Sequence, residues 1–301
     1  MQSILEINAM RWKDLFELVR DTIYGCSERQ TLQLGAALAF QGVFALAPLL
    51  VIAIALAGIF FGENAAKGQL DATLTDAVGP MMAEAIAETL THVHLTQSGW
   101  TATLVGFGFI LFAATGMFLQ LQLSLNAIWG VQLKPGWSFW TMVRGRFFAF
   151  VLVLGIGALL ILSLIANALV TALHAHLPDE SWSDKPYLWE GMNWLLTFLL
   201  QTLLFAMIFK LLPDALVAWR DVWVGALLTA LLFELGNYLF CQYLSWAVPG
   251  SVYGPAGSLV VVMLWVYYSS QILLFGVEFT KQFANKYGHP TRPAGYAMCR
   301  S

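Results

Sequence analysis

The sequence predicts an all-α, polytopic membrane protein with six transmembrane helices and with both termini in the cytoplasm. Three observations lead to this fold class. First, 59% of the 301 residues are hydrophobic and only 11% are charged, whereas soluble domains carry roughly 25% charged residues. Second, six apolar segments are long enough to cross a hydrocarbon core of about 30 Å as helices. Third, the basic residues gather in the connections on one side.

The six predicted spans share their length and their lack of charge, with Glu234 as the one internal exception: 34–62, 100–129, 147–173, 191–209, 222–246 and 250–277. They must be helices, because lipid offers no partner for open backbone groups, and they lack the alternation of barrel strands. The membrane domain thus covers 34–277. A cytoplasmic segment 1–33 precedes it, and a short basic tail 278–301 follows it.

The orientation follows from the lysines and arginines. Four segments on one side carry four, three, two and four basic residues, 13 in all: 1–33, 130–146, 210–221 and 278–301. The other side carries only Lys67 and Lys185, together with nine acids in its two loops, 63–99 and 174–190. The positive-inside rule places the 13 basic residues in the cytoplasm.

Two segments outside the spans show helical amphipathic spacing. Trp12, Phe16, Val19 and Ile23 repeat at helical intervals near the N-terminus. This predicts either a helix lying at the cytoplasmic interface or a helix packed under the bundle. In the first outer loop, 63–99, two apolar stripes flank Pro80, which predicts two short helices over the outer mouth.

Glu234 is the first candidate for a functional site, because a charge in the middle of a span is costly and faces the protein interior. Asn237, Tyr238 and Gln242 follow on the same side of that helix. They predict a polar wall along a substrate path. The alternative is a glutamate that joins helices through Gln201 or Asn167 in neighbouring spans.

The sixth span adds a second group of candidates. Tyr253, Gly254 and Gly257 surround a proline, which indicates either a broken helix start facing a cavity or a tight turn between spans. Further along the same span, a polar stripe is formed by Tyr267, Gln271 and Glu278.

Four histidines are weak candidates for a zinc or copper site, if the two outer loops meet: His92, His94, His174 and His176. We favour solvated loop histidines and expect no metal and no cofactor. Nucleotide-binding, zinc-protease and serine-hydrolase motifs are absent from the sequence. We therefore expect no enzyme activity and no nucleic-acid partner.

Several stretches resemble the YihY/BrkB family of bacterial inner-membrane proteins. The similar motifs are Leu212-Pro213-Asp214, Trp219–Ala226, Phe233–Gly236, Ser251–Leu259, Leu264–Gln271 and Phe275–Phe279. Pro255 and Val277 depart from the family pattern, and the similarity covers roughly 30–285. The resemblance implies a multi-pass protein of the bacterial inner membrane. Some members of the family have carried the label ribonuclease BN.

We expect transport or flipping of a lipid or another amphiphilic envelope component. The alternative is a non-transporting membrane scaffold for envelope integrity, and a ribonuclease is the least favoured reading. The expected partners are membrane lipids, with a second copy of the chain or envelope-assembly proteins as further possibilities.

Overall fold

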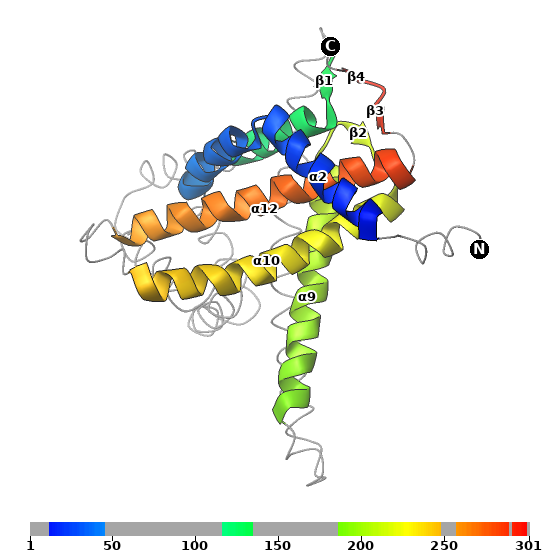
Figure 1. Cartoon of the computed structure of the whole chain (residues 1–301). Coiled ribbons are helices and arrows are strands. Elements are labelled where there is room, and N and C mark those ends of the chain that lie inside the picture. Colours follow the sequence, from blue (N-terminus) through cyan, green and yellow to red (C-terminus); the bar gives the residue numbers. More distant parts are fainter. Residues whose placement is uncertain (1–11, 46–115, 135–185, 248–256, 289–290, 300–301) are drawn as a thin grey trace, which may run out of the picture.

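The structure, a computed structural model, describes residues 12–45, 116–134, 186–247, 257–288 and 291–299 (Figure 1). These residues are mainly helical, and the helices are α2 (Trp12–Glu28), Thr31–Ala45, 116–129, α9 (Pro186–Leu211), α10 (Trp219–Ala247) and α12 (Gly257–Tyr287). Four short strands join them: β1 (Val131–Leu133), β2 (Ala215–Leu216), β3 (Arg292–Pro293) and β4 (Ala297–Cys299).

Three of the described helices are long and apolar enough to cross a membrane, over Trp194–Leu211, Trp219–Leu244 and Val260–Tyr287. They correspond to the predicted spans 191–209, 222–246 and 250–277. The predicted span 147–173 and the outer-loop helices lie outside the described residues, and spans 34–62 and 100–129 are described only in part. The count of six and the orientation therefore stay predictions.

α10 and α12 lie side by side and antiparallel (Figure 1), and a seam of small residues lets their backbones approach closely. Gly225 of α10 faces Thr280 of α12, and Gly276 of α12 faces Thr229 of α10. Both threonine hydroxyls donate to a carbonyl of their own helix at 2.7 Å, Thr229 to Gly225 and Thr280 to Gly276. Such small-residue interfaces are typical of helix pairs in membranes, where packing replaces the hydrophobic effect.

Further along the same pair, Tyr268 of α12 lies over Gly236 of α10. Its ring stacks on Phe240 at 5.2 Å between centroids and on Phe233 at 6.3 Å. Its hydroxyl donates to the carbonyl of Phe233 at 3.4 Å. A Cβ on Gly236 would come within 2.7 Å of the ring, so the glycine leaves the space that the ring fills.

The outward face of α10 has the pattern of a lipid-facing helix. Its middle exposes leucines, namely Leu227, Leu231, Leu235 and Leu239, and its two ends expose aromatic residues, namely Trp219, Trp223, Tyr243 and Trp246. Twenty residues separate Trp223 from Tyr243, a rise of about 30 Å at 1.5 Å per residue. This matches the thickness of a hydrocarbon core between two aromatic belts.

α9 runs at a steep angle to the α10–α12 pair (Figure 1). Contact is made by its C-terminal half, where Phe205 lies 5.8 Å from Phe233 of α10 between ring centroids. In the other half, Trp194, Leu195 and Leu199 are exposed. Beyond Leu211 the chain turns back into α10, and Lys210 closes this turn by donating to the carbonyl of Val217.

α2 is the amphipathic helix predicted near the N-terminus, and it packs on the bundle, whereas its place at a membrane interface stays a prediction. One face packs against α12, where buried Leu18 meets Phe279 and Phe283. The other face exposes Phe16, Val19 and Ile23 to the surroundings. The helix is thus packed on the bundle and amphipathic toward the outside at the same time.

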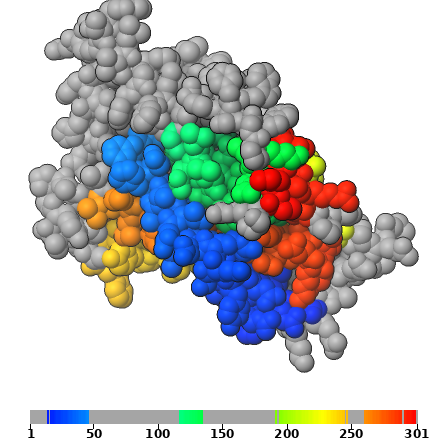
Figure 2. All heavy atoms as spheres, turned by 90° about the horizontal axis from the view of Figure 1, so that it is seen from above, coloured from blue at the N-terminus to red at the C-terminus, as the bar shows by residue number. Residues whose placement is uncertain are grey.

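The C-terminal tail forms two antiparallel ribbons that the sequence analysis did not predict. β1 pairs with β4, with Val131 opposite Cys299, and β2 pairs with β3, with Ala215 opposite Pro293. Figure 2 shows residues 12–45, 116–134 and the tail lying beside one another on one face. The all-α expectation therefore holds for the helices and misses these ribbons, because strands of two or three residues carry no readable period.

Candidate functional site

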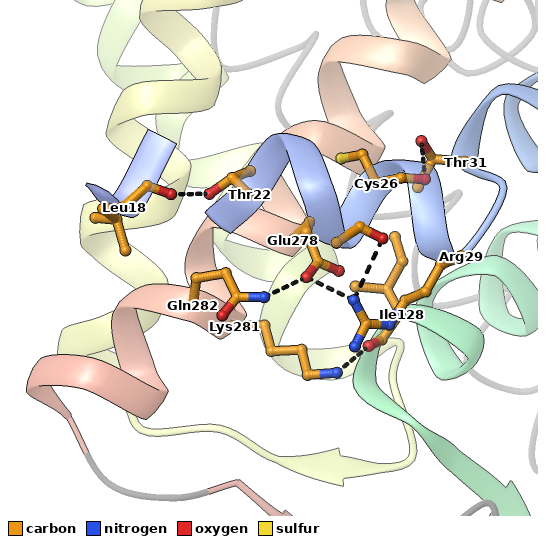
Figure 3. A network of polar contacts seen from close by, with 10 residues as sticks. Leu18, Thr22, Cys26, Arg29, Thr31, Ile128, Glu278, Lys281 and Gln282 are labelled. Carbon is orange, nitrogen blue, oxygen red and sulfur yellow. Dashed lines mark hydrogen bonds and ion pairs between the residues drawn. The ribbon is translucent and has the colours of Figure 1, made fainter. Parts of the chain in front are cut away.

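A polar network joins α2 to α12 at the end of the helix pair where the tail lies (Figure 3). The fully buried carboxylate of Glu278 accepts a hydrogen bond from Arg29 at 2.7 Å and one from Gln282 at 2.7 Å. Arg29 also donates to the carbonyl of Gly25 at 3.4 Å. The carboxylate lies directly against Gly25, so that no side chain fits between α2 and Glu278.

This pairing explains how a charged residue of α12 is tolerated in the interior. A buried charge is stable only when it is paired and hydrogen-bonded. One turn along α12 from Glu278, Lys281 donates to the carbonyl of Ile128 at 2.7 Å, near the C-terminal end of helix 116–129. A cation there complements the helix dipole. Glu278 thus anchors α2, and no described interaction joins it to Glu234.

A second buried network surrounds Asp214, in the connection between α9 and α10. Its carboxylate accepts from Asn126 at 2.8 Å and from Gln122 at 3.3 Å. Its backbone N–H donates to the side chain of Asn126 at 2.8 Å, and its carbonyl accepts from Ala294 of the tail at 3.0 Å. One residue therefore ties three separate segments of the chain together.

Glu234 lies half-buried, near the midpoint between the aromatic ends of α10. Within the described residues it makes no ion pair and no hydrogen bond. Its carboxyl group is close enough to Tyr268 of α12 for the two side chains to interact electrostatically. Asn237 is half-buried like Glu234, whereas Tyr238 and Gln242 are exposed. The predicted wall therefore runs along the border between the α12 contact and the outward face of α10.

The three residues of the predicted polar stripe of α12 lie in different surroundings. Tyr267 is half-buried, and Gln271 donates to the carbonyl of Leu32 at 3.3 Å while lying against Gly35. Gln271 also lines a cavity of about 530 Å³ between α2, the start of Thr31–Ala45, α10 and α12. Glu278 belongs to the network with Arg29 instead.

The remaining candidates are described little or not at all. Gly257 is the first residue of α12. Tyr253 and Gly254 lie outside the described residues, as do the four candidate metal ligands His92, His94, His174 and His176. Over the part of the chain that the structure describes, no three His, Cys, Asp or Glu side chains group into a metal site.

The structure adds residues that the sequence analysis did not select. Arg29 pairs with the α12 candidate Glu278. Tyr268 packs on Phe240 of α10, and Cys26 lines the cavity. Burial raises the pKa of the Cys26 thiol. The sequence does single out Arg29 in one respect, because it is the last charged residue before a long apolar segment. The residues around Tyr268 in the sequence do not indicate its role, because its ring packs against Gly236 of another helix.

Comparison with known proteins supports the location in a membrane. The family model described as Virulence factor BrkB matches residues 22–297. A UPF0761 membrane protein of Kangiella koreensis is 26% identical over 270 residues, which are 89% of this chain and 64% of that protein. One from Janthinobacterium sp. (strain Marseille) is 28% identical over 276 residues, 90% of this chain and 60% of that protein.

A UPF0761 membrane protein of Vibrio cholerae is 31% identical over 181 residues, 59% of this chain and 57% of that protein. The chain thus spans about three-fifths of the length of these relatives. No solved structure matches it. With a family model that covers nearly all of its helices, and with relatives that are membrane proteins, the chain belongs to the BrkB family of integral membrane proteins.

Proposed function

We propose that this protein moves a lipid or another amphiphilic envelope component across the bacterial inner membrane. The observation that carries the proposal is the place of Glu234, half-buried in the middle of a helix whose outer face is built for lipid. A charged residue at that depth costs about 2.5–3.5 kcal/mol on insertion scales. Charged residues that carry this cost inside a membrane helix are often functional.

The described contacts between α10 and α12 do not need Glu234. Glycine–threonine pairs and the Tyr268 ring hold these helices together. Glu234 has no ion-pair or hydrogen-bond partner among the described residues. A carboxyl group that is not needed for the described helix contacts could meet a polar head group or carry a proton, and this supports a role in transport.

The alternative function is a non-transporting scaffold for the envelope. The buried Arg29–Glu278 pair and the two ribbons of the tail favour it, since they make a rigid face out of segments far apart in the chain. A ribonuclease remains the least favoured function, because no catalytic constellation was found in the sequence.

Translocation of a labelled phospholipid in vesicles tests the proposal. The purified full-length protein is reconstituted with a phospholipid that carries a fluorophore on its head group, and a membrane-impermeant reductant bleaches the outer leaflet. We expect faster loss of inner-leaflet fluorescence than in protein-free vesicles. Glu234→Gln should slow this loss, since it keeps shape but cannot ionise.

Glu17→Gln is the matched control, because Glu17 is exposed and its ion pair in the described structure is with Lys286 at 2.8 Å. An exposed pair of this kind contributes about 0–1 kcal/mol, so the control should behave like the wild type. Equal rates for protein-containing and protein-free vesicles would refute transport of this probe class and favour the scaffold. Equal rates for Glu234→Gln and the wild type would remove Glu234 from the mechanism.

A further inference from the structure

The cavity beside α2 has a lining suited to hydrocarbon. Four elements supply its apolar walls, through Ile23 of α2, Leu32, Leu232 of α10, and Ile272 and Phe275 of α12. Its volume of about 530 Å³ lies within the range of small-molecule sites, roughly 300–1,000 Å³. It is more than three times the roughly 150 Å³ cavity known to hold a benzene ring.

Two of the polar side chains in the lining are already engaged by the protein. The Thr31 hydroxyl donates to the carbonyl of Cys26 at 3.2 Å, and the Gln271 amide donates to the carbonyl of Leu32 at 3.3 Å. A sugar or a nucleotide needs several convergent polar groups for its own hydrogen bonds. Since apolar side chains make up most of the lining and these two polar groups already have protein partners, the cavity favours a ligand part that makes no hydrogen bonds.

The rim of the cavity continues into the apolar outer surface. Ile23 is 57% exposed and Leu32 is 65% exposed. Both line the cavity and also face outward, and Phe16 and Val19 extend the same face of α2. In a membrane protein such a surface adjoins acyl chains, so a lipid can reach the cavity sideways without entering water.

We propose that this cavity binds one acyl chain of a membrane phospholipid. The chain lies between α2 and the α10–α12 pair, and the Ile23 and Leu32 side chains cover it at the rim. The inference rests on the proposed function, which it deepens by assigning the site that holds the apolar part of the substrate. Binding of an acyl chain does not require transport, so the cavity site and the proposed transport function can be refuted independently.

A photoactivatable phospholipid tests the site directly. The probe is a phosphatidylglycerol with a diazirine in one acyl chain, titrated into detergent-solubilised, lipid-depleted full-length protein. We expect saturable cross-linking that maps to the cavity residues of α2 and α12, with competition by unlabelled phosphatidylglycerol. Cross-links spread evenly over exposed leucines of α10, without saturation, would overturn the proposal.

Two neighbouring residues of α10 give a matched pair of variants. Leu232 lines the cavity, whereas Leu231 beside it is exposed and is not among the lining residues. Leu232→Trp fills the space and should weaken probe binding about tenfold, equivalent to about 1.4 kcal/mol. Leu231→Trp should bind like the wild type. Equal binding by both variants would refute the site.

A second variant protects the test against misfolding. Cys26 lines the cavity from α2, and Cys26→Phe fills it from another helix. Thermal melting in detergent identifies which variants are folded, and any folded filling variant should lose probe binding. Wild-type probe binding by the folded filling variants, in a protein that still moves lipid, would sink the cavity site alone. Intact binding in a protein that moves no lipid would sink the proposed function alone.

Discussion

The glycine–threonine seam between α10 and α12 predicts a large difference between two identical substitutions. At Gly276, an added Cβ would lie 3.0 Å from Cβ and 3.1 Å from Cγ2 of Thr229, and closer still to its hydroxyl oxygen. Ordinary contacts between carbon atoms are about 3.5–4.0 Å. Thr229 cannot rotate away without losing its 2.7 Å hydrogen bond to Gly225, and it is fully buried. Gly276→Ala must therefore push the helices apart.

Overpacking of this kind costs about 1–3 kcal/mol. Gly191 of α9 is the matched control, because it is exposed and no atom lies within 4 Å of the added Cβ in the described structure. Both glycines are helical, so the gain in helix propensity is common to both variants. The difference between them isolates the packing cost.

Thermal melting in detergent measures this difference. We expect Gly191→Ala to be neutral or slightly stabilised and Gly276→Ala to melt several degrees lower, at about 2–4 °C per kcal/mol. Adding Thr229→Ala to Gly276→Ala removes two of the three crowding atoms and should restore part of the loss. Equal melting of Gly276→Ala and Gly191→Ala would refute the close approach of α10 and α12.

Three further predictions concern α2, the cysteines and the topology. Arg29→Ala leaves buried Glu278 without its ion-pair partner, so it should cost up to about 3–5 kcal/mol of stability and lower the melting temperature. Arg20→Ala breaks an exposed pair with Asp21 and should change the melting temperature little. Equal melting of the two variants would refute the anchoring role. In single-cysteine variants in detergent, maleimide should modify exposed Cys299 faster than Cys26, whose raised pKa shifts its reaction to higher pH; faster reaction of Cys26 would contradict its burial. In intact spheroplasts, an impermeant maleimide should label Ser98→Cys and Ser183→Cys but not Ser138→Cys, and the reverse pattern would overturn the orientation.

The parts of the fold that depend on one helix at a time could be predicted from the sequence. The predicted spans 191–209, 222–246 and 250–277 recur as long apolar helices because lipid selects for uninterrupted apolar length. The helix at α2 was predicted for a related reason, since its apolar residues repeat with helical period. These signals lie within about 20 residues and need no partner.

The parts that depend on two helices could not be predicted. Gln271 and Glu278 were grouped because they share a face of α12, but Gln271 bonds to Leu32 and Glu278 pairs with Arg29. Spacing along one helix places residues on a face and does not say which neighbour that face meets. The ribbons were missed for the same reason, since each strand of two or three residues is stabilised by a distant segment.

The ribbons can be compared with the predicted number of membrane crossings, independently of the charge counts. β1 pairs with β4, β2 pairs with β3, and β3 and β4 are neighbours in the tail, so all four strands lie together at one end of the helices. On the predicted topology, the chain crosses the membrane twice between β2 and β3, through spans 222–246 and 250–277. Between β1 and β2 the prediction also has two crossings, through spans 147–173 and 191–209. Each pair of crossings returns the chain to the side that it left, so the common end of the four strands is compatible with the predicted spans, and the number of crossings stays a prediction.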